Sequence, residues 1–363
     1  MRTMRCYLAL EDGTVFAGES FGAEGTSTGE VVFNTSMSGY QEILTDPSYC
    51  GQIVTMTSPL IGNYGVNVED IEAAKLHLSG FVVKELARRY SNYRASGSLH
   101  DYLHAAGVVG ISGVDTRSLT RRLRDRGSLR GVISTELSDP AILVGKARAS
   151  TQMEGRNLVE TVMPRGETRI EPARGPAKYR VVAVDCGIKQ NILRELAQLG
   201  CEVRVVPPTT TAECILESRP HGLLLGNGPG DPATVGEAIA TMQALIGRLP
   251  IFGICLGHQL LALALGARTY KLKFGHHGAN HPVQNVDTGR VEITSQNHGF
   301  AVDVPSLESV GGRVTHINLY DQSLEGFAHA DHRVFAVQYH PEAAPGPHDS
   351  QYLFEQFVRM LGD

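Results

Sequence analysis

The sequence has few cysteines, and they follow no pairing pattern. Its six cysteines are spread over 363 residues, at positions 6, 50, 186, 201, 214 and 255. Disulfide frameworks and zinc clusters need cysteines at short, repeated spacings, so neither is suggested here. We therefore take each cysteine first as a small buried hydrophobic residue.

Long apolar runs and an excess of positive charge are also missing. The most apolar stretch, residues 260–267, is far shorter than the ~20 residues that span a bilayer. The first residues lack the core of a secretory signal, because Glu11 and Asp12 follow a very short apolar stretch. A formal net charge of -5 argues against nucleic acid as a partner. We expect a cytoplasmic protein that uses neither a membrane nor nucleic acid.

No compact phosphate-binding loop is present either. Residues 226–230 are GNGPG, but Pro229 has no N–H group to offer a phosphate and no lysine follows. Neither the Rossmann glycine spacing nor GxxxxGK followed by Ser or Thr occurs. This absence excludes a P-loop only, because other nucleotide-binding folds have less compact signatures.

The chain is long enough for two domains, since a single core rarely grows beyond ~250 residues. Up to about residue 60, short alternating runs predict strands, with Asp12-Gly13 as a hairpin turn. Helical periodicity follows at 69–76 and 115–126, with a short apolar run at 108–111 between them. We predict a mixed α/β domain over 1–160 and a linker over 161–178, which is rich in Pro, Gly and charge.

Residues 179–363 follow a different pattern. Apolar runs such as VVAVDCG, HGLLLGNG and LPIFGI alternate with helical patterns such as NILRELAQLG and AIATMQALIG. This rhythm predicts an α/β domain with a doubly wound, mainly parallel sheet covered by helices on both faces. Ligands bind such sheets in the loops that leave the carboxyl ends of the strands. The chemistry is therefore expected after Leu225, Ile254 and Tyr339.

Cys255 stands at the turn of a strand-turn-helix pattern, in the motif GICLGHQ. A nucleophile at such a sharp turn needs small neighbours, which Gly253 and Gly257 supply. The start of a helix also favours thiolate over thiol, through its dipole and its free N–H groups. A buried structural cysteine is the alternative, but the two glycines and the helix start favour a nucleophile. The pattern alone also fits peptidases and esterases.

A base for that thiol is expected in QYHPE, at the end of the strand VFAVQY. A thiol that attacks an amide needs a group to accept its proton and to protonate the leaving nitrogen, and one imidazole can do both. His340 supplies the imidazole. Glu342 can accept its second ring N–H and fix the tautomer, and Pro341 stiffens the turn between them.

Together these motifs resemble a known family. GNGPGDP, GICLGHQ and QYHPE are similar to the class I, or triad, glutamine amidotransferases. The whole chain resembles the glutamine-hydrolysing small subunit of carbamoyl-phosphate synthase, through segments such as VVFNTSMSGYQEILTDPSYCG, SGVDTRSLTRRLRDRG, KFGHHGANHPV, SQNHGFAV and HPEAAPGPHD. Amidotransferase subunits for anthranilate or aminodeoxychorismate synthesis resemble only the second domain, so the first domain selects the subfamily.

The resemblance implies a mechanism and a pocket. Cys255, His340 and Glu342 would be the catalytic residues. The glutamine pocket would be lined by Ser48, Gly228, Gly230, Leu256, Gln259, Asn297, Gly299 and Phe300. Backbone amides near Gly228 and at Leu256 could form an oxyanion hole. Because Ser48 precedes the catalytic domain, the pocket would involve both domains.

The resemblance also implies partners and cofactors. This chain would carry no cofactor and no metal, whereas ATP, magnesium and bicarbonate would be bound by a large synthetase subunit. The two subunits would form a heterodimer or a higher assembly. Ammonia from L-glutamine would pass internally to the large subunit, and carbamoyl phosphate would serve arginine and pyrimidine biosynthesis.

Two further groups of residues invite a functional interpretation. His276, His277 and His281 lack nearby Cys or carboxylate ligands, so a loop near the pocket is favoured over a metal site. A basic stretch is interpreted as a solvated helix face or a partner contact. It comprises Arg117, Arg121, Arg122, Arg124, Arg126 and Arg130.

Three alternative functions stay open. An amidotransferase subunit with another ammonia acceptor is disfavoured by the first domain. A glutamine-binding regulatory subunit without turnover is disfavoured by the complete set of Cys255, His340 and Glu342. A cysteine peptidase on the same fold would need a pocket open to polypeptide.

Overall fold

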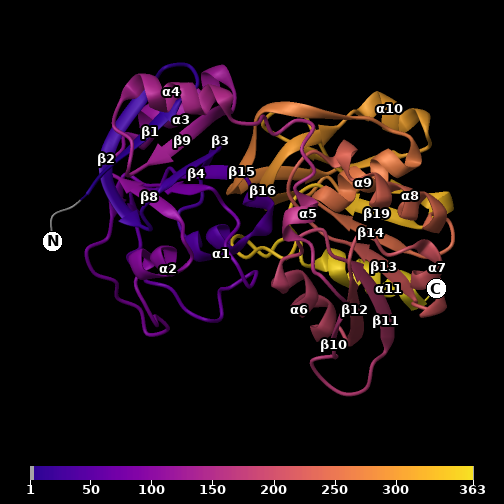
Figure 1. The fold of residues 1–363 in the computed structure, drawn as a ribbon. Helices are drawn as coiled ribbons and strands as arrows, with labels where there is room; N and C mark the ends of the chain where they lie inside the picture. Colours follow the sequence, from indigo (N-terminus) through magenta and orange to yellow (C-terminus); the bar gives the residue numbers. More distant parts are fainter. Residues whose placement is uncertain (1–3, 363) are drawn as a thin grey trace. The chain divides into compact units, whose positions relative to one another are not determined.

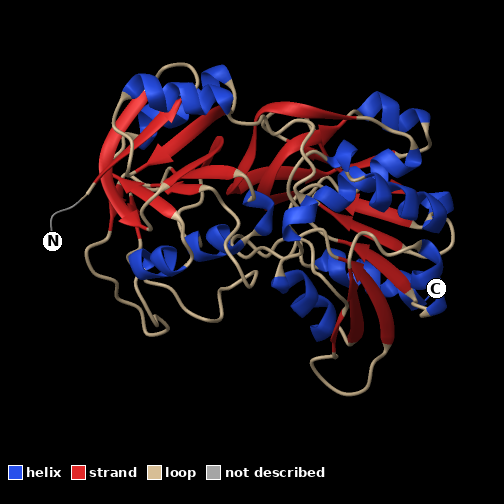
Figure 2. Cartoon of the chain, viewed as in Figure 1, coloured by secondary structure: helices blue, strands red, loops and turns tan. Residues whose placement is uncertain are grey.

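The computed structural model describes residues 4–362, which form two compact units. The first unit contains the described residues up to Glu154 together with Lys273–Gly278, and the second contains Gly155–Leu272 and the chain from Ala279 onward. Figures 1 and 2 show the elements of each unit. The sequence pattern did not indicate that a short segment near residue 275 joins the first unit.

A closed barrel forms the centre of the first unit, with strand order β1-β2-β8-β6-β4-β3-β9. Its strands are β1 Arg5–Leu10, β2 Val15–Gly22, β3 Thr26–Asn34, β4 Gln52–Met56, β6 Gly80–Val82, β8 Val109–Ser112 and β9 Leu129–Ser134. Alternate apolar residues such as Leu8, Ile53 and Ile111 are fully buried in one core cluster. The predicted hairpin is confirmed, because β1 pairs antiparallel with β2 and Gly13 has a φ of 97°.

Short helices and loops complete the first unit. They are α1 Tyr40–Thr45, the 3-10 turn η1 Pro47–Tyr49, α2 Leu99–Ala105, α3 Thr116–Arg126 and α4 Pro140–Ala149, with a small sheet of β5 Leu60–Ile61 and β7 Glu85–Leu86. The helix predicted over 115–126 is therefore confirmed. Its N-cap is Asp115, whose side chain accepts the backbone N–H of Ser118 at 2.9 Å.

The helix predicted over 69–76 is wrong, because this segment has irregular backbone. Side chains accept several of its N–H groups instead. Asn67 Oδ1 accepts the N–H groups of Glu69 and Asp70 at 2.8 and 3.0 Å, and Thr45 Oγ1 accepts that of Glu72 at 3.0 Å. Such local side-chain bonds compete with helix formation.

The second unit is built on a ten-stranded sheet with the order β10-β12-β11-β13-β14-β19-β18-β17-β15-β16. Its strands are β10 Thr168–Ile170, β11 Tyr179–Val184, β12 Cys201–Val206, β13 Gly222–Leu225, β14 Ile251–Ile254, β15 Thr269–Asn285, β16 Val291–Val302, β17 Arg313–Asn318, β18 Leu324–His329 and β19 Val334–Val337. The five strands from β12 to β19 pair in parallel, as the apolar runs predicted. The antiparallel strands beyond β19 were not predicted. Part of the predicted linker also forms a strand, β10, which pairs antiparallel with β12.

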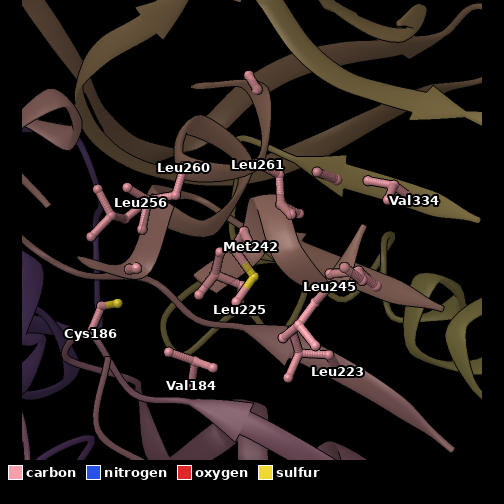
Figure 3. Packing of buried hydrophobic residues seen from close by; sticks show 14 of the residues in the cluster. Val184, Cys186, Leu223, Leu225, Met242, Leu245, Leu256, Leu260, Leu261 and Val334 are labelled. Atoms are coloured by element: carbon pink, nitrogen blue, oxygen red, sulfur yellow. The ribbon is translucent and has the colours of Figure 1, made fainter. Parts of the chain in front are cut away.

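Helices cover both faces of the parallel strands. The helices of this unit are α5 Val159–Val162, α6 Gln190–Gln198, α7 Ala212–Glu217, α8 Gly236–Leu245, α9 Leu256–Leu265, α10 Val304–Ser309 and α11 Tyr352–Gly362, with 3-10 turns η2 Pro232–Thr234 and η3 Ala330–His332. Figure 3 shows one core, in which Leu260 of α9 and Met242 of α8 lie over Leu223 and Leu225 of β13. The other core packs α6 and α11 against alternate residues of the same strands. The predicted doubly wound arrangement is confirmed.

Two composition-based expectations can be compared with the structure. The longest α-helices within residues 4–362 have 11 residues, so none of them can cross a bilayer. All six cysteines are free, and five are buried. Cys214 is exposed, so the expectation that every cysteine is a buried hydrophobic residue is wrong for that position.

Candidate active site

Cys255 occupies a strained turn between β14 and α9. Its φ and ψ are 55° and -106°, and its N–H still pairs with Val337 O at 2.9 Å. The neighbouring glycines are sterically required. A Cβ at Gly257 would lie 2.1 Å from Leu225 O, and one at Gly253 would lie 2.8 Å from Gly257 O. The structure therefore has the sharp elbow that a nucleophile at this position needs.

His340 and Glu342 lie together in the loop after β19. The Nδ1 atom of His340 is 2.7 Å from Glu342 Oε1, and both side chains are buried. The backbone N–H of His340 donates to Ser295 O of β16 at 2.9 Å, which fixes the start of the loop. Within residues 4–362, no group forms a regular hydrogen bond with the other ring nitrogen, Nε2. That nitrogen is available for a reaction.

The electrostatics of this corner favour a charged imidazole. Burial by itself would lower the pKa of His340, but the carboxylate of Glu342 and the interaction with the Cys255 side chain raise it to about 10. Burial would likewise raise the pKa of Glu342, yet Lys189 and then His340 hold it down at about 2. The side chains of Cys255, His340 and Glu342 are therefore electrostatically coupled.

Lys189 is a site residue that the sequence analysis missed. Its ammonium group is almost fully buried and donates to Glu342 Oε1 at 2.8 Å and to Ala343 O at 2.6 Å. The amide of Asn191 donates to Glu342 O at 2.7 Å. The signal was present in the motif DCGIK, because this lysine follows β11 at the carboxyl edge of the sheet.

The glycine loop after β13 lies beside Cys255. A Cβ at Gly228 would lie 2.3 Å from Cys186 O, and Gly230 has a φ of 92°, so neither position accommodates a side chain without strain. Leu256 is the first residue of α9, so its N–H has no partner within the helix. These backbone groups are the ones predicted to form the oxyanion hole.

Several predicted pocket residues gather around β16 and α9. The thiol of Cys255 lies 3.6 Å from Asn297 O. Gln259 donates its side-chain N–H groups to Phe300 O at 2.9 Å and to Gln338 Oε1 at 3.0 Å, so this amide is held rigidly. Gly299 precedes Phe300 on β16. The structure thus places Asn297 beside the nucleophile, and the contribution of these residues to a glutamine pocket stays a prediction.

Ser48 belongs to the first unit. It lies in η1 and is nearly buried, and its backbone N–H donates to Asp46 Oδ1 at 2.9 Å. Its contribution to a glutamine pocket stays a prediction.

The three histidines near residue 280 do not lie in a loop, as the sequence analysis expected. They are part of the long strand β15. The ring of His277 lies 6.0 Å from that of Tyr49, and the ring of His281 contacts Tyr320 edge to face at 5.2 Å. The glycines and Pro282 in this segment suggested a loop. The strand nevertheless continues through them, and its pairing with β17 begins at Val283.

Known family models cover most of the chain. Residues 8–133 match the model described as carbamoyl-phosphate synthase small chain, CPSase domain. Residues 182–360 match the model described as glutamine amidotransferase class-I.

Full-length relatives show the same similarity. The chain is 55% identical to a carbamoyl phosphate synthase small chain from Syntrophotalea carbinolica, over 99% of this chain and 98% of the relative. It is 56% identical to the protein of that name from Akkermansia muciniphila, over 99% of this chain and 98% of the relative. It is 53% identical to the one from Solidesulfovibrio magneticus, with the same two coverages.

Proposed function

Because the chain belongs to the carbamoyl-phosphate synthase small-chain family, we propose that Cys255, His340 and Glu342 perform its glutamine hydrolysis. The family makes the chain the glutamine-hydrolysing subunit of that synthase, and a small chain implies a large synthetase subunit as partner. The proposal concerns how this subunit carries out the reaction. It rests on the 2.7 Å contact between His340 and Glu342 in the loop after β19, together with the elbow that presents Cys255.

The reaction begins with attack by sulfur. The Cys255 thiolate adds to the side-chain carbonyl carbon of glutamine, and the carbonyl oxygen becomes negative. The imidazolium of His340 then donates its Nε2 proton to the nitrogen as the C–N bond breaks, which releases ammonia and leaves a thioester on Cys255. The raised pKa of His340, about 10, suits this role, because the ring is protonated at neutral pH.

Water completes the cycle. The neutral His340 accepts a proton from water, and the resulting hydroxide attacks the thioester carbon. The C–S bond breaks, glutamate leaves, and the proton on His340 restores the starting ion pair. Glu342 accepts the Nδ1–H throughout and keeps Nε2 directed at the reacting atoms.

Backbone amides would stabilise the intermediates. The N–H of Leu256 and amides near Gly228 are suited to the oxygen that becomes negative, and one lost donor in such a site costs ~3 to 4 kcal/mol. Asn297, Gln259 and Ser48 provide neutral polar groups for the amino and carboxylate ends of glutamine, with the backbone of Gly230, Gly299 and Phe300 around them. No metal or cofactor on this chain is needed for these steps.

The released ammonia would be used by the large subunit. We infer that this subunit binds ATP, magnesium and bicarbonate, and that carbamoyl phosphate formed there serves arginine and pyrimidine biosynthesis in the cytoplasm. The two chains would associate as a heterodimer or as a higher assembly of heterodimers.

The test is a comparison of nitrogen donors. The chain is purified with its large subunit, and carbamoyl phosphate formation is measured from glutamine and from ammonia for the native protein and for Cys255→Ser. Cys214→Ser is the matched control, since this exposed cysteine lies away from β14 and α9 in the same unit.

The expected result is loss of the glutamine-driven reaction in Cys255→Ser, with the ammonia-driven reaction retained and Cys214→Ser unchanged. If glutamine still drives the reaction in Cys255→Ser, the nucleophile is wrong. If the native complex releases glutamate but makes no carbamoyl phosphate, the acceptor is wrong while the triad stands.

A further inference from the structure

One face of helix α3 forms a basic groove in the first unit. Arg117, Arg121 and Arg124 recur at helical spacing, so they project from the same side of α3. A cavity of about 650 Å³ lies beside them. This groove, called the basic groove below, is lined by Thr57, Pro59, Lys84, Thr116, Arg117, Thr120, Arg121 and Arg124.

The cations of the basic groove are not neutralised within the protein. No carboxylate is among the lining residues. In the part of the chain that the structure describes, Lys84, Arg117 and Arg121 form no ion pair, and Arg124 pairs only with its exposed neighbour Asp125 at 2.8 Å. Four cations thus share an open groove on a chain whose net charge is -5.

The basic groove adjoins a second cavity on the same helix. This cavity, of about 470 Å³, shares Arg117 and Arg121 with the basic groove and also includes Asp115 and Asp125 in its lining. Arg122 is held by Asp12 at 2.7 Å, and Arg126 lies 4.0 Å from the same carboxylate. Among the arginines of α3 in the described part of the chain, Arg117 and Arg121 are therefore the ones without an ion pair, and both line the basic groove.

We propose that the basic groove docks an acidic surface segment of the large synthetase subunit. This inference rests on the family assignment, which requires such a partner. All lining residues fall within 57–124, inside the part of the chain that matches the small-chain CPSase domain. That part is additional to the glutamine amidotransferase domain, so a surface specific to this synthase belongs there.

The chemistry of the groove favours a carboxylate-bearing segment. Guanidinium groups bind carboxylates through paired N–H donors, and three of them at successive turns can engage acidic residues along an extended chain. Single exposed ion pairs stabilise an interface only weakly, but several together steer association and fix orientation. The groove would therefore act mainly on the rate of association and on its salt dependence.

The experiment compares two charge reversals on α3. Binding of the purified chain to the purified large subunit is measured by surface plasmon resonance at low and moderate salt, for native protein, for Arg117→Glu with Arg121→Glu, and for Arg126→Glu. Arg126 is the matched control, because it is an exposed arginine of the same helix outside the basic groove. Glutaminase activity of each free chain and its thermal unfolding are recorded alongside.

We expect the double reversal to weaken association about tenfold or more, mostly through slower binding, and to flatten the salt dependence of the Kd. Arg126→Glu is expected to bind like native protein. Free-chain activity and thermal unfolding should be the same in all three. Equal affinities of the double reversal and the control would overturn the proposal.

A second measurement separates other occupants and other failures. A photo-crosslinking amino acid at position 121 should capture an acidic segment of the large subunit, whereas one at 126 should not. If titration with inorganic phosphate shows binding that depends on Arg117 and Arg121 while large-subunit affinity is unaffected, the groove serves a small anion and the docking proposal is wrong. If the native protein releases no glutamate from glutamine, the proposed function is contradicted instead.

Discussion

Three buried ionisable side chains accompany Cys255 in the proposed site and balance its charge. They are Lys189, His340 and Glu342. Lys189 and Glu342 form an ion pair at 2.8 Å. In the proposed mechanism, the thiolate of Cys255 and the imidazolium of His340 form a second pair before attack. After ammonia leaves, the thioester and the neutral imidazole carry no charge, so the sum is zero at both stages. A buried site avoids a large desolvation cost only when its charges are paired in this way.

Removing Lys189 tests that balance. We expect Lys189→Met to destabilise the protein by about 3 to 5 kcal/mol, because Glu342 would keep a buried charge without its lysine partner. Denaturant unfolding at neutral pH measures this change. As a control, Arg268→Met removes an exposed cation that pairs with Asp303 at 3.1 Å, and should cost less than about 1 kcal/mol. Similar losses for the two variants would mean that Lys189 is not part of a buried charge network.

The pair of His340 and Glu342 also predicts a pH dependence of stability. The pKa of His340 is raised from 6.5 to about 10, so its contribution is fully present below pH 6.5 and is lost as pH rises through 10. The pKa of Glu342 is lowered from 4.5 to about 2, so its contribution is present above pH 4.5 and is lost as pH falls through 2. Both contributions are complete only between pH 4.5 and 6.5.

Glu342→Gln should therefore lose the most stability inside that window. We expect the difference in unfolding free energy between native and Glu342→Gln to be about 3 to 5 kcal/mol near pH 5 to 6 and to shrink toward pH 10. Denaturant titrations across the pH range give this difference directly. A difference that grows with pH would mean that His340 is neutral in the folded protein.

At the scale of elements, the junction of β14 and α9 determines where the nucleophile lies. A parallel strand ends, the chain turns through Cys255 with positive φ, and the helix starts at the next residue. The end of β13 approaches Gly257 so closely that only a hydrogen atom fits there. The turn is therefore possible only with glycine at this position. Strain at Cys255 is offset by the packing of Leu260 and Leu261 into the core shown in Figure 3.

Gly257→Ala tests this junction. The added methyl group would meet Leu225 O at 2.1 Å, so β13 and α9 must separate. We expect a loss of about 1 to 3 kcal/mol in unfolding free energy and loss of glutaminase activity, since Cys255 moves with α9. Gly236→Ala, at the first residue of α8, meets no atom within 4 Å and should leave both quantities nearly unchanged. Activity retained in Gly257→Ala would contradict the steric argument.

The elements that the sequence predicted correctly are those with one dominant signal. Apolar runs identified β11, β13 and β14 because parallel strands buried on both faces carry few polar residues. The segment at 69–76 had helical periodicity, but Asn67 accepts the N–H of Glu69 and Thr45 accepts that of Glu72; the second contact joins residues 27 apart in sequence, so a local pattern does not reveal it. The position of Lys189 after β11 could be read from the local motif, but its pairing with Glu342, 153 residues away, could not.

At the scale of the whole molecule, the sequence indicated two domains and the chemistry of the second, but not the course of the chain between units. Motifs that are local in sequence, such as GICLGHQ and QYHPE, could be interpreted without a structure. The barrel of the first unit could not be foreseen, because closure depends on pairing β9 with both β1 and β3, strands more than 90 residues earlier. The structure adds that Lys273–Gly278, within β15, belongs to this first unit.

That segment should support the first unit more than the second. The ring of Phe274 lies 5.8 Å from that of Phe33 on β3, Lys273 O accepts the N–H of Ser128 at 2.8 Å, and His277 O accepts that of Thr35 at 3.2 Å. We expect Phe274→Ala to reduce the unfolding free energy by about 2 kcal/mol, less than for a fully buried phenylalanine because this ring is only partly buried.

Hydrogen exchange can locate the effect of Phe274→Ala. Protection should fall in β3 and around the turn that joins α3 to β9, because those backbone groups contact the segment, whereas β13 and β14 should keep native protection. Tyr270→Ala is the control, since Tyr270 lies on the same strand but in the second unit. It should leave β3 unaffected. If Phe274→Ala lowers protection in β13 and β14 as much as in β3, the segment is not specific to the first unit. If protection falls only in β3 and its neighbours, a strand from the amidotransferase half of the sequence stabilises the barrel.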